Sequence, residues 1–171
     1  MTTRPLQRDY ARRELERRFV LPQLPSAVDA AVFVRLRDLF VEGSELRLRV
    51  VESPVGEVLI VKLGQKRPDP EAPGDPRCRR LTTIYMTERE AALLLALPGR
   101  GACKRRYRLE DAGQMWAIDV WEEPAARRGL VMAEVECEGV AELAALAVPA
   151  WAGREVTADP AFSAFALSSP V

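Results

Sequence analysis

The chain of 171 residues contains no histidine. This absence removes the commonest general base and the commonest zinc ligand of proteins, and it excludes Ser-His-Asp and Cys-His nucleophilic schemes. The three cysteines, Cys78, Cys103 and Cys137, are odd in number and lack the spacing of a metal site, so we expect reduced thiols and no disulfide framework. Any catalysis is therefore expected to depend on carboxylates, cations and a hard metal ion.

The sequence also lacks an excess of charge and long apolar runs. Its 25 basic and 25 acidic residues cancel, which argues against a general affinity for nucleic acid or for an anionic membrane. The longest apolar runs, such as AALLLAL at 91–97, are too short to cross a membrane, and the N-terminal residues contain no apolar signal segment. We expect a cytoplasmic protein with neither a nucleic-acid nor a membrane partner. Its oligomeric state is not predicted.

Turn residues divide the chain into short segments, most of them strand-like. The predicted strands lie at 14–21, 32–41, 45–52, 55–66, 80–87, 104–109, 114–123 and 129–138. No linker separates two cores, so the pattern indicates one α+β domain over residues 1–171. A succession of antiparallel strands favours a curled or closed sheet.

Helices and one long loop are predicted between and after these strands. Thr87 and Glu90 form a capping box ahead of an apolar run, which predicts a helix. Asp159 as an N-cap and Pro160 in the first helical position predict a shorter one. The proline-rich segment 67–76 predicts a flexible loop that contributes nothing to a core.

Pairs of charged residues one position apart recur along the predicted strands. The pairs are Glu14/Glu16, Arg35/Arg37, Arg47/Arg49, Lys104/Arg106 and Glu134/Glu136, with a looser set at Lys62 and Lys66. Because strand side chains alternate between faces, we expect the pairs to build one surface rich in carboxylates and cations. That surface is either the wet face of a sheet or the lining of a barrel. In a barrel, the cations would clamp phosphate oxygens and the glutamates would hold Mg²⁺ or Mn²⁺.

In their order, these motifs resemble the CYTH superfamily, the triphosphate tunnel metalloenzymes that include adenylate cyclases, thiamine triphosphatases and inorganic tripolyphosphatases. Residues 14–19, ELERRF, are similar to the ExExK opening of that family. The resemblance continues through LRLR at 46–49, KLGQK at 62–66, IYMTEREAALLLAL, KRRY at 104–107, WAIDVWEEPAARRGLVMAEVECE and PAWAGREVTADP. It implies an α+β fold with a closed eight-stranded antiparallel β-barrel and flanking helices, whose lumen binds a triphosphate together with a divalent metal ion.

The resemblance also implies roles for the charged residues of these motifs. The phosphate-binding cations would be Arg18, Arg47, Arg49, Lys62, Lys104 and Arg106. The ligands of Mg²⁺ or Mn²⁺ would be Glu14, Glu16, Asp119, Glu134 and Glu136. Of these, Glu16 and Glu136 would be catalytic and position water. The resemblance assigns no firm role to Arg35 and Arg37.

The sequence departs from the family pattern at three acidic positions. Thr82 and Ile84 stand where the family has the two glutamates of Arg-x-Glu-x-Glu-Tyr, and Ala117 replaces the glutamate of Glu-x-Asp. Arg18 replaces the lysine of ExExK, which exchanges a compact ammonium for a planar fork. The resemblance therefore implies a lumen with fewer carboxylates, which would be more cationic and would favour polyanion binding while weakening or removing one metal site.

The leading hypothesis is metal-dependent hydrolysis of a triphosphate, either inorganic tripolyphosphate or an organic triphosphate. Adenylate cyclisation is disfavoured because the cyclase branch opens with HFxxxxExExK and this chain has no histidine. A non-catalytic module that binds polyphosphate or a nucleotide triphosphate is the alternative, motivated by Thr82, Ile84 and Ala117. A third possibility is an interaction protein that kept the barrel and lost the ligand.

Overall fold

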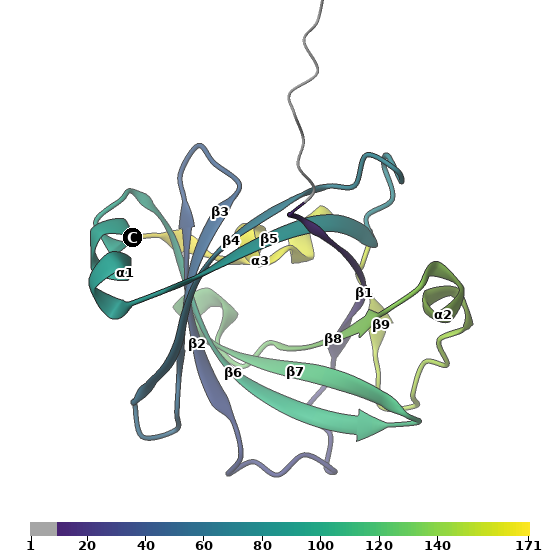
Figure 1. The fold of residues 1–171 in the computed structure, drawn as a ribbon. Helices are drawn as coiled ribbons and strands as arrows, with labels where there is room; N and C mark the ends of the chain where they lie inside the picture. Colours follow the sequence, from purple (N-terminus) through teal and green to yellow (C-terminus); the bar gives the residue numbers. More distant parts are fainter. Residues whose placement is uncertain (1–9) are drawn as a thin grey trace, which may run out of the picture.

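Eight long strands close into an antiparallel barrel in the computed structural model, which describes residues 10–171 (Figure 1). They are β1 (Arg12–Leu21), β2 (Val34–Val41), β3 (Leu46–Glu52), β4 (Val58–Pro68), β5 (Cys78–Met86), β6 (Gly99–Asp111), β7 (Gln114–Glu123) and β8 (Val131–Cys137). Their order is β6-β2-β3-β4-β5-β1-β8-β7, and pairing of β6 with β7 closes the ring. The short strands β9 (Arg154–Glu155) and β10 (Ser169–Pro170) pair with β1 and β6. The predicted closed eight-stranded barrel is confirmed.

Three helices flank the barrel: α1 (Glu88–Leu95), α2 (Val140–Ala145) and α3 (Ala164–Leu167). The predicted capping box is present at α1, since the Glu90 amide donates to Thr87 Oγ1 at 3.3 Å and the Thr87 amide donates to Glu90 Oε2 at 2.8 Å. Asp159 caps a 3-10 turn, Pro160–Phe162, rather than a full α-helix. Of the helices described, none is long and apolar enough to cross a membrane.

The apolar faces of the strands form three clusters on the outside of the barrel, beneath the helices and the connecting segments. Ala91 of α1 covers the first cluster, Leu143 of α2 covers the second, and Trp151 packs against the third. The strand residues of these clusters include Leu39, Leu48, Val61, Leu15, Cys137, Phe19, Tyr107, Trp116 and Val135. Because neighbouring side chains alternate, the charged faces of the same strands line the inside.

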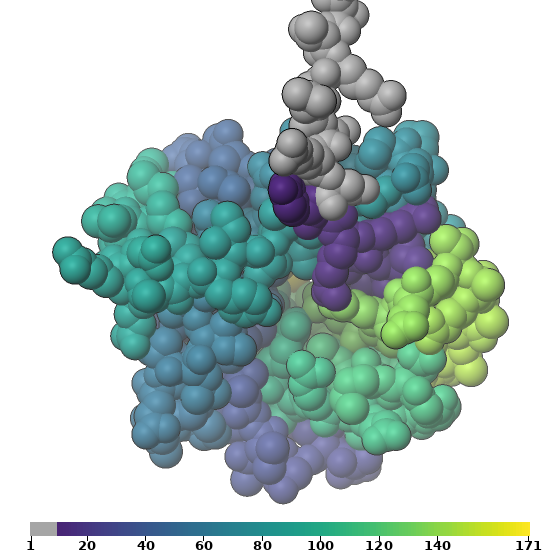
Figure 2. Space-filling model, in the orientation of Figure 1, coloured from purple at the N-terminus to yellow at the C-terminus, as the bar shows by residue number. Residues whose placement is uncertain are grey.

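The C-terminal segment closes one end of the lumen. Val156 and Leu167 pack against strand residues at that end, among them Trp121. The rings of Phe40 on β2 and Phe165 on α3 meet edge to face, with centroids 5.9 Å apart. In Figure 1, α3 lies at the far end of the barrel, and Figure 2 shows a narrow hollow near the centre of the face toward the viewer.

The proline-rich segment is more closely tied to the barrel than predicted. β4 extends to Pro68, and the next residue, Asp69, is 1% exposed and forms ion pairs with Arg13 at 2.5 Å and with Arg80 at 3.1 Å. Ala72 packs against the cluster under α2. The prediction of a loop without core contacts was therefore wrong, because a buried carboxylate between two arginines anchors it.

Candidate functional site

A cavity of about 390 Å³ lies inside the barrel and is lined by most of the predicted site residues. Those that line it are Glu14, Glu16, Arg18, Arg47, Arg49, Lys62, Arg106, Glu134 and Glu136. The strand register explains this convergence, since directly opposed residues of paired strands point to the same face. Glu16 lies opposite Glu136 and Arg18 opposite Glu134, while Arg49 lies opposite Lys62 on the other side of the barrel. The cavity thus has an acidic wall on β1 and β8 and a cationic wall on β3 and β4.

In the part of the chain that the structure describes, two cations of the cationic wall have no acidic partner. Within residues 10–171, no carboxylate lies within ion-pair distance of Arg47 or Lys62. Burial, and then the charge of Arg49, lower the pKa of both Arg47 and Lys62. A bound anion would relieve this repulsion, so Arg47 and Lys62 are the groups best placed to bind a polyanion.

Arg49 is already bound by the carboxylate of Asp38, a residue that the charged-pair pattern does not include. Its Nε and Nη2 atoms donate to Asp38 Oδ1 and Oδ2 at 2.6 and 2.7 Å, and both residues are buried. Burial raises the pKa of Asp38, but Arg49 outweighs that effect and holds the pKa far below its usual value. Asp38 is the single acid on the inner face of β2, so a search for charged pairs passes over it.

Lys104 and Asp119 do not line the cavity but lie beneath its wall, with exposures of 2% and 1%. Asp119 accepts hydrogen bonds from Lys104 Nζ at 2.6 Å and from Arg106 Nε and Nη2 at 2.6 and 2.7 Å. Arg106 Nη2 also donates to Glu134 Oε2 at 2.8 Å. Burial opposes the charge of Asp119, yet Arg106 and Lys104 hold its pKa far below the usual value. This network fixes the Arg106 guanidinium at the cavity surface.

A lysine of β4, Lys66, reaches the acidic wall and was not among the predicted site residues. Lys66 Nζ lies 2.9 Å from Glu16 Oε2 and also contacts Glu14 Oε2. Burial lowers the pKa of Lys66, but Glu16 and Glu14 outweigh burial and raise it above its usual value. Glu136 is half-exposed and lies 3.3 Å from Arg12, and partial burial followed by the charge of Glu14 raises its pKa.

Arg18 is held at the closed end of the lumen by the C-terminal segment. Its Nη1 donates to the Phe162 carbonyl at 3.0 Å, and its Nη2 donates to the Thr157 carbonyl at 2.9 Å. These bonds occupy much of the guanidinium fork that was predicted to bind phosphate. Arg18 therefore links the C-terminal segment to the cavity wall.

On β5, the inner positions at which glutamates were expected lie one residue away from the predicted Thr82 and Ile84. Leu81 lines the cavity and Thr83 lies opposite Gly64, another cavity residue, whereas Thr82 and Ile84 point to the other face. The assignment of Thr82 and Ile84 was wrong because a slip of one residue exchanges the faces of a strand. The inner face still lacks carboxylates at this point, since it carries Leu81 and Thr83. Ala117 does lie on the inner face, opposite Glu134.

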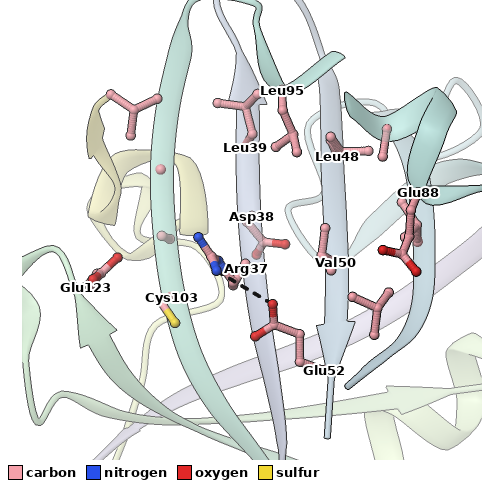
Figure 3. Close-up of a pocket in the computed structure, with 16 residues that line it drawn as sticks. Arg37, Asp38, Leu39, Leu48, Val50, Glu52, Glu88, Leu95, Cys103 and Glu123 are labelled. Carbon is pink, nitrogen blue, oxygen red and sulfur yellow. Dashed lines mark ion pairs between the residues drawn. The ribbon is translucent and has the colours of Figure 1, made fainter. Parts of the chain in front are cut away.

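Arg35 and Arg37 do not belong to the inner surface, which corrects the expectation of one shared face. Leu36, Asp38 and Phe40 take the inner positions of β2. Arg35 forms an outer ion pair with Glu122 at 3.1 Å, and Arg37 forms one with Glu52 at 3.6 Å. Figure 3 shows Arg37 and Glu52 in an outer groove that also contains Leu95 of α1 and Cys103 of β6.

No protein-family model matches the chain, and no curated protein matches it. Among solved structures, the chain is similar to two crystal structures of NE1496, described in one as a hypothetical protein and in the other as an inorganic triphosphatase. Identities are 23% and 22% with TM-scores of 0.58 and 0.57, and the matches cover 91% of this chain and 97% and 93% of those chains. A candidate adenylate cyclase from Bacillus halodurans matches at 13% identity and a TM-score of 0.55, over 77% of this chain and 84% of that one. At these identities the likeness shows a shared fold.

Proposed function

We propose that the protein binds a triphosphate inside the barrel and hydrolyses it, with inorganic tripolyphosphate or an organic triphosphate as the substrate. The observation that carries this proposal is the division of one cavity into two walls. On one side, Arg47 and Lys62 have no carboxylate partner among residues 10–171, and Glu14, Glu16 and Glu136 lie on the other. The inorganic triphosphatase that shares the fold supports the reaction class.

In this proposal, the cationic wall holds the phosphate chain. Arg47 presents its guanidinium fork to phosphate oxygens and Lys62 adds a point charge. Arg106, on β6, is held by Asp119 and Glu134, so it adds fixed charge at the cavity surface. Arg49 is held by Asp38, so it contributes fixed charge rather than a movable donor. Preorganised cations in a partly buried cavity stabilise the charge of the transferring phosphoryl group without reorganisation of solvent.

The acidic wall would position the attacking water. Glu136 has a pKa above its usual value, through partial burial and the charge of Glu14, which suits it to accept a proton from water. Glu16 lies directly opposite Glu136 and would orient the same water. Mg²⁺ or Mn²⁺ bound to Glu14, Glu16 and Glu136 would neutralise phosphate charge.

The donor types fit such a hard metal ion, since Glu14, Glu16 and Glu136 share the inner face of β1 and β8 and a bound cation would relieve the repulsion of Glu136 by Glu14 and Glu16. Their present arrangement is not a finished site. Across the described part of the chain, no group of three or more His, Cys, Asp or Glu residues is arranged to hold a metal ion. Asp119 and Glu134 are bound to Arg106, so we propose a metal set reduced to Glu14, Glu16 and Glu136.

A non-catalytic binding module is the second candidate. It is favoured by the inner face of the barrel at Leu81 and Thr83, which the strand register puts there in place of Thr82 and Ile84, and at Ala117. None of these three residues is a carboxylate. The cationic wall does not depend on these positions. Such a protein would bind triphosphate or polyphosphate without turning it over.

Phosphate release from tripolyphosphate in Mg²⁺ or Mn²⁺ tests the proposal. We expect Arg47→Gln to lower kcat/KM roughly tenfold to hundredfold, the range for loss of one charged hydrogen bond. Arg37→Gln is the matched control, since it removes an arginine from the outer face of the neighbouring strand and should leave kcat/KM unchanged. Glu136→Gln is expected to lower kcat by about 100-fold or more.

The outcomes separate the two candidates. Turnover that responds to Arg47 and not to Arg37 supports hydrolysis in the lumen. A wild-type protein that binds tripolyphosphate tightly in calorimetry but releases no phosphate is the binding module. Absence of both binding and turnover contradicts both functions.

A further inference from the structure

The Lys66 ammonium lies between two glutamates of the acidic wall. Its ammonium lies 2.9 Å from Glu16 Oε2 and contacts Glu14 Oε2, and the two glutamates are only 8% and 7% exposed. Two nearly buried carboxylates side by side need a positive partner, because an uncompensated buried charge is costly. Lys66 supplies that charge. Nothing in the proposed function accounts for it.

The strand register explains why Lys66 reaches so far. Lys66 on β4 lies opposite Leu81 on β5, and Leu81 lies opposite Arg12 on β1. The lysine side chain therefore crosses β5 over an apolar residue to reach carboxylates two strands away. The Cβ atom of an acidic residue in place of Leu81 would lie within about 5.5 Å of the Lys66 Cβ atom. Its carboxylate would then bind the Lys66 ammonium in place of Glu14 and Glu16. The contact of Lys66 with Glu14 and Glu16 thus depends on an uncharged residue at position 81.

We infer that Lys66 is a built-in counter-ion for Glu14 and Glu16, which a divalent cation has to displace in order to bind, and that the displaced ammonium then binds a phosphate oxygen of the substrate. The last step rests on the proposed function. The first step is a simple exchange of one cation for another on the same two carboxylates. Because metal and triphosphate would each favour the released lysine, each is expected to raise the affinity of the protein for the other.

Calorimetric titration of Mg²⁺ without any phosphate tests the exchange. Lys66→Met keeps most of the apolar stem and removes the competing charge, so we expect Mg²⁺ to bind roughly tenfold more tightly than to the wild type. Lys62→Met is the matched control, because it removes a lysine from the same strand and the same cavity, but one that contacts no carboxylate among residues 10–171. Its effect on Mg²⁺ affinity should be clearly smaller.

A second measurement uses the wild-type protein and does not depend on the folding of a variant. The chain has three lysines, Lys62, Lys66 and Lys104, so lysine-selective ¹⁵N labelling gives a simple side-chain NMR spectrum. On saturation with Mg²⁺, the Lys66 Nζ resonance should move to a new position. The Lys104 resonance should stay, because its ammonium is buried and bonded to Asp119.

Three results overturn the inference: Mg²⁺ affinity of Lys66→Met equal to or weaker than that of the wild type, a Lys66 resonance that does not move at Mg²⁺ saturation, or no Mg²⁺ binding to either protein. None of these readouts uses a substrate. A wild type that shows the exchange but releases no phosphate from tripolyphosphate leaves the inference standing and refutes the hydrolase. Turnover without the exchange refutes only the inference.

Discussion

Replacing Asp119 by Asn should remove the charge that holds the buried side of the lumen wall together. Asp119 is 1% exposed and accepts three hydrogen bonds of 2.6–2.7 Å from Lys104 and Arg106. After the change, Arg106 keeps Glu134 at 2.8 Å. Lys104, which is 2% exposed, keeps the ring of Trp121, whose centroid lies 5.1 Å from its ammonium. The substitution therefore leaves a buried ammonium without a carboxylate.

The expected cost follows from this geometry. Breaking a buried ion pair by removal of one partner costs about 3–5 kcal/mol. Glu134 still neutralises Arg106, so we expect the low end, about 3 kcal/mol, which is a large part of the 5–15 kcal/mol typical of a folded domain. Glu136→Gln is the matched comparison, since Glu136 is half-exposed, and its effect on the free energy of unfolding should stay within about 0.5 kcal/mol.

Urea unfolding at pH 7, followed by tryptophan fluorescence, measures both variants. The double variant Lys104→Met/Asp119→Asn should recover about 1 kcal/mol or more, because the unpaired ammonium is gone. A cost below about 1 kcal/mol for Asp119→Asn would refute the buried network. Loss of Mg²⁺ affinity without loss of stability would instead make Asp119 a metal ligand, as the family resemblance implies.

Two further predictions concern titratable groups. The pKa values of Asp38 and Asp119 lie far below the usual value, so below about pH 4 the unfolded chain takes up protons that the folded protein does not. The free energy of unfolding should therefore be constant near pH 7 and fall as the pH drops below about 4, and urea midpoints that do not change between pH 6 and pH 3 would contradict this. Burial, and then Glu122, raise the pKa of Cys103 to about 12, so alkylation of this thiol at pH 8.5 should be much slower in the native protein than in urea. Equal rates in mass-spectrometric labelling would show that its thiolate is not suppressed.

Much of the fold could be predicted because local signals agree with it. The capping box at Thr87 and Glu90 marks α1, and alternation marks the strands. Alternation alone left a wet sheet and a barrel equally possible. The order of the motifs, through the family resemblance, favoured the barrel. In the structure the apolar face is covered from outside by α1, α2 and Trp151, and the sequence pattern carries no information on which segments cover it.

The errors at the site have a shared physical cause. Period-two alternation says which residues share a face, but not which face is the inner one or how deep a residue lies. Arg37 has the same spacing pattern as Arg47, yet it lies outside because β2 turns Asp38 inward. Thr82 was placed on the wrong face by one residue. Depth depends on the stagger of the strands around the barrel, which puts Lys104 beneath the cavity and Arg106 at its surface.

A crystal structure of the protein with tripolyphosphate would show directly whether the lumen is the binding site. We expect phosphate oxygens within hydrogen-bond distance of the Arg47 guanidinium and the Lys62 ammonium, inside the barrel and toward the end that the C-terminal segment closes. Tripolyphosphate bound only on the outer surface, for example at Arg35 and Arg37, with the lumen cations still unpaired, would contradict it.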